Sequence, residues 1–495
     1  MSSPDIVVIG AGMGGATIAH ALAPSGAEIL ILDKGHQLPD RPENRDARAI
    51  FQRGFFRPQE SWYDSAGKPF NPGNYYYNGG NSKFYGAVLM RYRAEDFDGL
   101  AHADGDTPRW PFRYGELAPW YDRAEALYQV RGETGTDPTE PAHGGDYPFA
   151  PVPDERPIAE VRERLRRIGL KPFPLPLGVD IERWLSHGRT PWDAFPDART
   201  GKMDAETCAL LPALTHANVH LRNGVEVRRL IAEPGGGRIE AVEYVEGGET
   251  RRVAPKLVVL AAGAVRSAAI LLASGGVANR SDMVGRHFMN HNLSAMIGID
   301  PRFHNDSIYQ KTFGLNDFYL GDGKGGPPLG NVQLLGRVSG AILKSDLRRV
   351  PEFLLEAMSR KAIDFLIMSE DLPDPASRVR LDGERIVLEW RRSNMTAHEG
   401  LKRVMRAALR QAGFPLVLTH LFDRRTPSHQ CGTIRIGSDP AAAPLDPFGR
   451  AFDHPNLFVA DASTLVTSAA VNPSLTVAAL ALRAAGHIRE TELRA

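Results

Sequence analysis

The sequence contains only two cysteines, Cys208 and Cys431, in 495 residues. Two cysteines exclude a disulfide scaffold and a metal site built from cysteines, and they fit a reducing compartment. Lysine plus arginine and aspartate plus glutamate are balanced at 59 each. The chain therefore has no net field that favours a nucleic-acid partner or an anionic membrane surface.

Long apolar runs are also missing, and none reaches the ~18 residues that a membrane-spanning helix needs. The first run, Ile6–Ile9, is too short for the core of a signal peptide and has no basic segment before it. We therefore expect a mature protein that starts near Met1, lies in the cytoplasm and has no membrane partner. The 49 glycines and 37 prolines predict long irregular connections.

The N-terminal segment has the pattern of a dinucleotide-binding unit. A buried strand over Asp5–Ile9 precedes a glycine turn and an apolar-periodic helix, and a second strand over Ala27–Leu32 ends in an acid. In such a unit one glycine permits the tight turn, one lets the backbone reach a pyrophosphate, one lets the helix pack, and the acid accepts from a ribose hydroxyl. These positions are Gly10, Gly12, Gly15 and Asp33. The alternative is a plain glycine turn.

Two later segments help to identify the cofactor. Lys256–Ala261 is a predicted strand that runs into Ala262 and Gly263, and Asn456–Ala460 is another that ends in Asp461. This pair resembles the pattern of flavoproteins with two dinucleotide folds, in which the late acid contacts the ribityl–phosphate region. For Asp461, a helix N-cap is the alternative.

The middle of the chain has a different character. Residues 36–75 form a predicted long loop rich in aromatic residues, which either cap a ligand cavity or pack against each other. Alternating segments farther along predict an antiparallel sheet, crossed by a helix over His398–Ala412, that we assign to a substrate domain. These segments are Leu293–Ile299, Leu329–Leu335 and Arg378–Leu388.

The predicted fold class is α/β, or α+β overall: a Rossmann-like FAD-binding domain with two dinucleotide folds, plus an antiparallel-sheet substrate domain. We expect the FAD-binding domain to comprise residues 1–92, 201–292 and 436–495. Residues 293–435 would form the substrate domain, and residues 93–200 a mixed segment that contributes to the substrate domain and its cap.

Several motifs together resemble the glucose–methanol–choline (GMC) family of flavin oxidoreductases over nearly the whole chain. Gly10–Asp33 resembles its FAD-binding unit, and the segment with Gly80, Asn81 and Ser82 resembles its Gly-Gly-x-Ser signature. Further similar segments are Gly263–Gly275, Val284–His291, the His-x-x-Gly-Thr run from His429 and the Asn-Pro-x-x-Thr run from Asn472. In Val284–His291, Asn290 replaces the aspartate of the family pattern.

The resemblance implies oxidation of a CH–OH group, in which the alcohol proton passes to a base and a hydride to flavin N5. His429 matches the family's base, and an imidazole with an ordinary pKa near ~6.5 suits that role. Asn472 matches a second position that orients the hydroxyl, because an amide cannot act as the base. An alternative or additional role for Asn472 is an N-cap before Pro473 at the first helical position.

The resemblance also implies a set of cofactor-binding residues. They are Gly10, Gly12, Gly15, Asp33, Gly80, Asn81, Ser82, Val227, Ala262, Gly263, Asp461, Asn472 and Pro473. Family members with covalent flavin have a histidine at the position that we align with Phe84. Phenylalanine cannot form that bond, so we expect noncovalent FAD. Only Cys208 stands where related sequences are richer in cysteine, and we expect no metal site.

The substrate is inferred from the branch of the family. The short chain and the run Gly80–Gly86 look most like the bacterial pyranose-oxidase-like and C-glycoside 3-oxidase branch. That branch implies oxidation of a sugar or glycoside hydroxyl at C2 or C3 to a ketone, with oxygen or another electron acceptor completing the cycle. The alternatives are a sterol or other non-sugar alcohol as substrate, and a flavin-containing lyase. The oligomeric state stays open.

Overall fold

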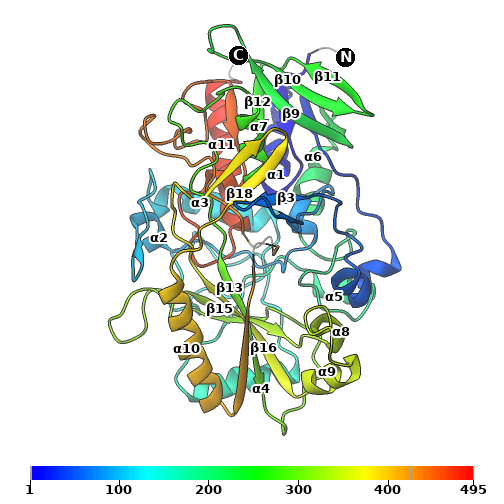
Figure 1. Cartoon of the computed structure of the whole chain (residues 1–495), viewed down its shortest axis with the longest axis vertical. Helices are drawn as coiled ribbons and strands as arrows, with labels where there is room; N and C mark the ends of the chain where they lie inside the picture. The colour runs from blue at the N-terminus through cyan, green and yellow to red at the C-terminus, as the bar shows by residue number, and fades with distance from the viewer. Residues whose placement is uncertain (1–2, 424, 427–428, 494–495) are drawn as a thin grey trace.

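The computed structural model of the chain describes residues 3–423, 425–426 and 429–493. Figure 1 shows two halves stacked along the long axis of the molecule. The upper half holds elements from the beginning and the end of the chain together with residues 219–272, and the lower half holds residues 156–167 and most elements between residues 292 and 421. The segments that form the upper half are therefore far apart in sequence.

A five-stranded sheet in the order β20-β12-β1-β2-β8 forms the centre of the upper half. All neighbouring strands run parallel, and β1, β2, β12 and β20 are buried along their whole length. Complete burial is expected for parallel strands that are covered on both faces. The strands are β1 (Ile6–Ile9), β2 (Ile29–Leu32), β8 (Val219–Arg222), β12 (Leu257–Leu260) and β20 (Leu457–Val459). The predicted Rossmann-like unit is confirmed.

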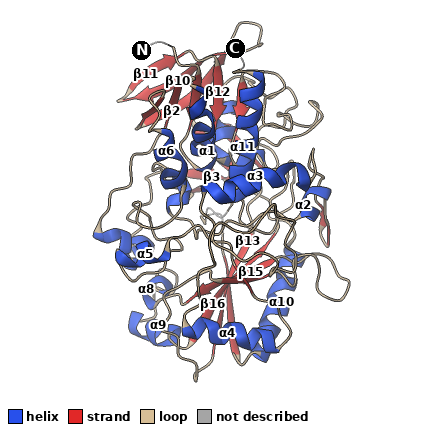
Figure 2. Ribbon diagram, turned by 180° about the vertical axis from the view of Figure 1, so that it is seen from behind, coloured by secondary structure: helices blue, strands red, loops and turns tan. Residues whose placement is uncertain are grey.

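Helices and a second sheet surround these strands. Helix α1 (Met13–Leu22) packs against α11 (Ser474–Thr491), which also contacts α3 (Tyr114–Leu127) (Figure 2). Helix α7 (Ala264–Leu272) follows β12 directly and contacts the first strand of an antiparallel meander. The meander strands are β9 (Val225–Ala232), β10 (Ile239–Glu246) and β11 (Glu249–Val253).

The lower half is organised by a six-stranded antiparallel sheet in the order β19-β13-β16-β15-β14-β7. Its strands are β7 (Phe173–Pro174), β13 (Asn292–Ile299), β14 (Phe313–Leu315), β15 (Asn331–Gly336), β16 (Ala362–Ser369) and β19 (Leu416–Leu421). Helices α4 (Arg156–Arg167) and α10 (Met395–Gln411) share an apolar core with this sheet, and α9 (Glu352–Ser359) contacts β16. The prediction of an antiparallel sheet crossed by a helix near residues 398–412 is confirmed.

One predicted member of that sheet lies elsewhere. The segment Arg378–Leu388 forms β17 (Arg378–Asp382) and part of β18 (Arg385–Glu389), which pair in a separate four-stranded sheet. Its other strands, β3 (Trp62–Asp64) and β4 (Pro69–Phe70), come from the segment predicted to be a long loop. Strands of two and three residues are too short to show a periodicity in the sequence, and their partner strand is more than 300 residues away. The alternating pattern of Arg378–Leu388 therefore predicts a strand but does not identify the sheet to which it belongs.

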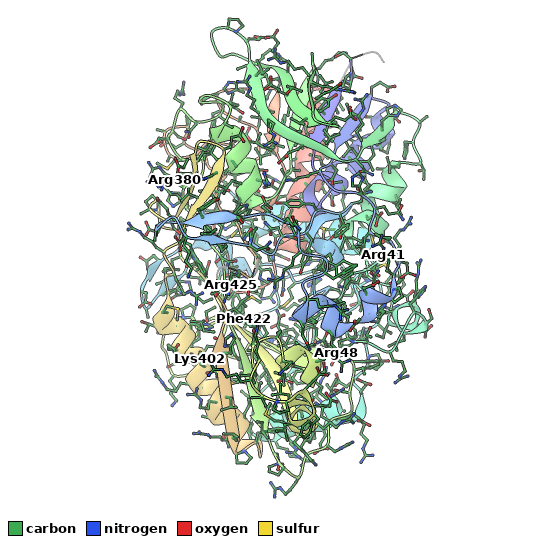
Figure 3. All side chains as sticks on the ribbon, turned by 45° about the vertical axis from the view of Figure 1, so that its right-hand side comes forward. Arg41, Arg48, Arg380, Lys402, Phe422 and Arg425 are labelled. Carbon is green, nitrogen blue, oxygen red and sulfur yellow. The ribbon has the colours of Figure 1, made fainter. Side chains whose placement is uncertain are left out.

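The remaining named helices and strands are short. They are α2 (Ala94–Asp98), β5 (Ala101–His102), β6 (Gly105–Asp106), α5 (Ile181–Ser186), α6 (Leu211–Ala213) and α8 (Gly340–Leu343). Among the residues that the structure describes, no helix combines the length and apolarity needed to cross a membrane. In Figure 3 the labelled cationic side chains lie on both halves of the molecule, with Arg380 on the upper half and Lys402 on the lower half.

Candidate active site

The first glycine turn is held between the ends of parallel strands. Gly10 has φ +101°, and a Cβ there would lie 2.4 Å from the backbone oxygen of Ala261 at the end of β12. A Cβ on Gly15 would lie 1.9 Å from the backbone oxygen of Gly10. A Cβ on Gly12, in contrast, would have no protein atom within 4 Å. Gly10 and Gly15 are therefore needed for the fold of the turn, while Gly12 borders open space in front of helix α1.

A second glycine turn faces the first. The backbone N–H of Gly79 donates to the oxygen of Ala11 at 3.0 Å, and a Cβ on Gly80 would lie 3.3 Å from the Cα of Gly12. Gly80 itself has φ +58°. Because both turns present backbone to the same space, an elongated ligand can approach each of them closely.

Side-chain hydrogen bonds fix the second turn. The Asn81 side-chain oxygen accepts from the N–H of Tyr75 at 2.9 Å. Ser82 Oγ donates to the oxygen of Gly79 at 2.6 Å and accepts from the N–H of Ala205 at 3.1 Å. These bonds keep the loop backbone in place before any ligand arrives.

The carboxylate of Asp33 ties the first turn to the end of β2. It accepts from the N–H of Ala11 at 2.6 Å and from the N–H of Gly35 at 2.7 Å, one on each oxygen. Burial raises the pKa of Asp33, and both N–H bonds oppose that shift. Each oxygen keeps a second lone pair, so a ribose hydroxyl can still bind there. The N–H of Val225 donates to the Asp33 backbone oxygen at 3.0 Å, which starts strand β9 beside Asp33 and places buried Val227 two residues further along it.

Asp461 joins three segments at the end of β20. One carboxylate oxygen accepts from the N–H of Gly263 at 2.9 Å and from Ser267 Oγ at 2.5 Å. The other accepts from the N–H of Ser463 at 2.8 Å, so Asp461 caps the short 3-10 helix Ala462–Thr464. The N-cap interpretation of Asp461 is therefore confirmed. The carboxylate also holds the turn with Ala262 and Gly263 against β20, and a Cβ on Gly263 would have no protein atom within 4 Å.

These turns together form a cradle that fits a dinucleotide. Gly12, Gly80 and Gly263 all present backbone without a side chain, and Gly12 and Gly263 border open space. The cradle lies before the N-terminus of α1, where helix N–H groups and the helix dipole favour phosphate. A pyrophosphate flanked by two nucleoside units matches an elongated space lined in this way.

Two further predicted residues, His429 and Asn472, contact each other. His429 Nε2 lies 3.2 Å from Asn472 Nδ2, and both side chains are partly exposed. His429 has φ +69°, a left-handed conformation that is uncommon for a residue other than glycine. The structure thus brings together the imidazole and the amide that the sequence analysis selected.

Asn472 does not cap a helix. Helix α11 begins at Ser474, Pro473 occupies the N-cap position, and no side chain makes a capping bond there. The predicted N-cap role of Asn472 is wrong. Its side-chain oxygen accepts from Gln333 Nε2 at 2.6 Å, which turns the amide nitrogen toward His429. The Asn472 amide is therefore oriented by Gln333 and contacts His429.

Three residues that the sequence analysis did not select complete this network. Lys311 Nζ donates to the Gln333 side-chain oxygen at 3.1 Å and lies 3.3 Å from Asp193 Oδ2. On the opposite side, His291 Nδ1 lies 2.7 Å from His429 Nδ1. Only His291 stands in a family-like motif, Val284–His291. Lys311 lies just before β14, and Gln333 lies within β15. Neither residue stands in a motif that would identify it from the sequence.

The electrostatics of the site keep the imidazole neutral. Removal of water around the ring lowers the pKa of His429 well below its usual value, and positive charge on His291 or Lys311 lowers it further. Burial also lowers the pKa of His291. At neutral pH His429 therefore has an unprotonated nitrogen that can accept a proton from a hydroxyl group.

Phe84 lies in an aromatic cluster. Its ring stacks on Tyr75 with the centroids 3.6 Å apart, and Phe56 meets it edge-on at 5.6 Å. Two rings of the predicted aromatic loop, Tyr75 and Phe56, therefore pack on Phe84. A solvent-open pocket in the same loop is lined mainly by polar residues, among them Arg53, Arg57 and Glu60.

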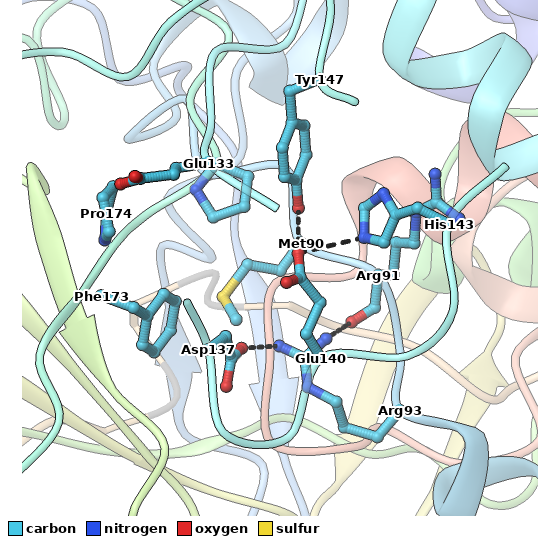
Figure 4. Close-up of a pocket in the computed structure, with 11 residues that line it drawn as sticks. Met90, Arg91, Arg93, Glu133, Asp137, Glu140, His143, Tyr147, Phe173 and Pro174 are labelled. Atoms are coloured by element: carbon cyan, nitrogen blue, oxygen red, sulfur yellow. Dashed lines mark hydrogen bonds and ion pairs between the residues drawn. The ribbon is translucent and has the colours of Figure 1, made fainter. Parts of the chain in front are cut away.

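A separate polar cluster contains the one group of possible metal ligands found among the described residues, Asp122, Glu125 and His143. Arg91 Nη2 lies 2.7 Å from Asp122 and 2.5 Å from Glu125, so a guanidinium already neutralises both carboxylates. Figure 4 shows the same region, where Glu140 contacts His143 and Tyr147 and where Arg93 pairs with Asp137. This arrangement is a buried ion-pair network rather than a ligand cage with an open centre.

Comparisons with known proteins point to one family of enzymes. The two GMC oxidoreductase family models, N-terminal and C-terminal, match residues 187–293 and 373–481, and an NAD(P)-binding Rossmann-like domain matches residues 8–41. The chain is similar to the 6'''-hydroxyparomomycin C oxidase of Streptomyces lividus, with 29% identity over 97% of this chain and 90% of that protein. It is also similar to the C-glycoside 3-oxidase of Microbacterium trichothecenolyticum, with 26% identity over 98% and 96%. Pyridoxine 4-oxidase from Mesorbium loti shares the fold, with a TM-score of 0.66 at 19% identity over 99% of this chain and 100% of that one.

Proposed function

The chain belongs to the GMC oxidoreductase family and is an FAD-dependent CH–OH oxidoreductase, and we propose that it oxidises a secondary hydroxyl of a sugar or glycoside to a ketone, with His429 as the base. The proposed hydroxyl is at C2 or C3 of a pyranose ring. The observation that carries the proposal is the pairing of His429 Nε2 with Asn472 Nδ2 at 3.2 Å.

We assign noncovalent FAD to the cradle. The proposed contacts to it are Gly10, Gly12, Gly15, Asp33, Gly80, Asn81, Ser82, Val227, Ala262, Gly263, Asp461, Asn472 and Pro473. Bound FAD supplies the hydride acceptor. Phe84 supports a noncovalent cofactor, because its ring has no nucleophilic atom and is stacked on Tyr75.

The protein residues handle the proton. The substrate hydroxyl takes the place beside His429 Nε2 and Asn472 Nδ2, where the amide donates to the hydroxyl oxygen and the imidazole accepts its proton. Asn472 cannot accept that proton, so the reaction depends on one base. The low pKa of His429 keeps the base ready at neutral pH.

The choice of a sugar is supported by two relatives that the chain matches over nearly its whole length, a C-glycoside 3-oxidase and a 6'''-hydroxyparomomycin C oxidase. The test is anaerobic mixing of the oxidised holoenzyme with D-glucose, an aryl O-glucoside, an aryl C-glucoside, paromamine and cholesterol. We expect at least one sugar or glycoside to bleach the flavin, and cholesterol to leave it oxidised. Bleaching by cholesterol alone would replace the proposal with a sterol substrate, and no bleaching by any sugar or glycoside would refute it.

The role of His429 is tested in the same experiment. We expect His429→Ala to lower the rate of flavin reduction by about 10²- to 10⁴-fold, the usual scale for a general base, while FAD stays bound. A suitable control is His398→Ala, because His398 is also a buried histidine but bonds Ser294 and Ser369 in the lower half. Wild-type reduction by His429→Ala would remove the base from the proposal.

A further inference from the structure

The opposing positions of His291 and His429 follow from a local backbone pairing. Met289 and Cys431 form an antiparallel bridge, with both N–H···O distances at 3.0 Å. In an antiparallel register, the residue two positions after Met289 stands opposite the residue two positions before Cys431, on the same side of the pair. The bridge therefore sets the two imidazoles against each other, with ring centroids 4.8 Å apart and their Nδ1 atoms at 2.7 Å.

The far nitrogen of His291 determines its tautomer. His291 Nε2 lies 3.0 Å from the backbone oxygen of Ser468 and 2.7 Å from that of Ala469. Carbonyl oxygens only accept, so Nε2 must carry a hydrogen. The ring is 1% exposed, and burial lowers its pKa, so His291 is neutral. Its Nδ1 is then a bare acceptor.

The tautomer of His429 follows from that of His291. The one hydrogen between the two Nδ1 atoms must belong to His429, because His291 Nδ1 has none. A neutral His429 with Nδ1–H has a bare Nε2, and this is the nitrogen that faces Asn472. The opposite arrangement would put the lone pair of His291 Nε2 against the oxygens of Ser468 and Ala469.

We propose that His291 is a positioning residue: it holds His429 in the Nδ1–H tautomer, so that Nε2 is the proton acceptor, and it stabilises the imidazolium that forms when His429 takes the substrate proton. The proposal rests on the proposed function of His429 as the base. In the transfer, the O–H bond of the substrate breaks and an Nε2–H bond forms. The Nδ1–H of His429 then donates to His291 as a charge-assisted hydrogen bond.

The surrounding charges limit this pair to one added proton. Lys311, paired with Asp193, lies on the Asn472 side of His429 and opposes any further positive charge. On the His291 side the nearest acid is Glu370, which accepts from the N–H of Ala469 at 2.9 Å and lies 3.1 Å from His102. Asp371 is engaged by the N–H groups of Asn290 and Ser393. Glu370 thus holds the backbone N–H of Ala469, and Asp371 holds the segments of Asn290 and Ser393.

Two substitutions separate positioning from packing. In His291→Gln, the amide oxygen can accept from His429 Nδ1–H while the amide N–H groups donate to the carbonyl oxygens. In His291→Leu, the side chain fills similar space but accepts nothing. His398→Leu is the matched control, because it also replaces a fully buried histidine with two hydrogen-bond partners.

We measure anaerobic flavin reduction by the best sugar or glycoside of the panel, the substrate concentration at half-maximal rate, FAD content and the thermal midpoint. We also record ¹⁵N spectra of the histidine-labelled holoenzyme, in which the His429 signals are assigned by their loss in His429→Ala. We expect His291→Leu to slow flavin reduction about 10- to 100-fold, a usual effect of removing the partner that orients a functional histidine. Half-saturation and FAD content should stay unchanged, and His291→Gln should recover most of the rate.

The spectra test the tautomer without reference to activity. Wild type and His291→Gln should show His429 with a protonated Nδ1 and an unprotonated Nε2, whereas His291→Leu should show Nε2–H. Equal rates and equal spectra for the Gln and Leu variants would overturn the proposal and leave His291 a packing residue. If His429→Ala itself reduces flavin at the wild-type rate, the proposed function fails instead.

Discussion

The sharpest test of the cradle compares an added methyl group at three glycines. Gly12 has φ −76° and ψ −167°, which any residue can adopt, and a Cβ there meets no protein atom within 4 Å. The fold itself should therefore tolerate Gly12→Ala. Gly14 lies two residues after Gly12, and a Cβ on it would lie 1.6 Å from the backbone oxygen of Ala460. Gly14→Ala should therefore disturb the contact between α1 and β20.

The expected magnitudes follow from overpacking. An inserted methyl group that meets a well-fitted neighbour costs about 1–3 kcal/mol. For Gly12→Ala the proposed neighbour is bound FAD, so FAD should bind about 5- to 150-fold more weakly. For Gly14→Ala the neighbour is backbone, which cannot move aside cheaply, so the loss of at least about 1–3 kcal/mol falls on folding. Gly115→Ala is the control, because its Cβ also meets no protein atom within 4 Å and Gly115 is an exposed position of helix α3.

The assay uses apoprotein reconstituted with FAD. Quenching of flavin fluorescence gives the Kd, and thermal unfolding of the apoprotein gives the stability of the fold. We expect Gly12→Ala to change only the Kd, Gly14→Ala to lower the thermal midpoint, and Gly115→Ala to change neither adversely. A Gly12→Ala variant that binds FAD as tightly as wild type would show that the cofactor does not approach this glycine.

Four further predictions concern the site and its support. Gln333→Leu removes the hydrogen-bond donor of the Asn472 side-chain oxygen, so the amide group can rotate. We expect flavin reduction to slow about 5- to 30-fold, since a buried polar atom without a hydrogen bond costs about 1–2 kcal/mol. A rate equal to wild type would contradict the orienting role of Gln333. Because the pKa of His429 is lowered, its ring stays neutral as pH falls through the ordinary range of histidine; flavin reduction should be flat from pH 8 to about pH 6, and a falling limb near pH 6.5 would contradict this. The same shift means that the unfolded chain binds more protons below about pH 6.5, so the free energy of unfolding should decrease there. Lys83→Met leaves the buried carboxylates of Asp204 and Glu206 without the ammonium group that lies 2.7 Å from each. We expect it to lower the free energy of unfolding, measured with denaturant, by about 3–5 kcal/mol. Lys256→Met, which removes the exposed partner of Asp5, is the control, and an equal loss of stability in both variants would refute the difference between buried and exposed pairs.

The parallel sheet and its glycine turns were predictable because their signals are local. Ile6–Ile9, the turn after it and Ile29–Leu32 lie within one short stretch, and uninterrupted apolar runs mark buried parallel strands. The pairing of His429 with Asn472 was also accessible, since both stand in motifs. Here the structure agrees with the sequence analysis because each element can be recognised without knowing its partner.

The remaining network depends on contacts between distant segments. Gln333 and Lys311 lie in or just before short strands of the antiparallel sheet, and a glutamine or lysine in a strand is ordinary in sequence. Their function appears only when strand β15 is placed beside residue 472, some 140 positions later. Strands β3 and β4 were missed for the same reason, because each has two or three residues and depends on β18 for its place.

Backbone conformation gives a further reason to regard this network as a functional unit. Lys311, His429 and Ala469 all have left-handed φ values, +57°, +69° and +53°, although none is glycine. Such a residue costs about 1–2 kcal/mol. All three lie in the chain of contacts that runs from Lys311 through Gln333, Asn472, His429 and His291 to the carbonyl oxygen of Ala469. These conformations fix where each of the three residues begins, and the hydrogen bonds fix where the side chains end, so that one imidazole nitrogen and one amide nitrogen can face the same hydroxyl.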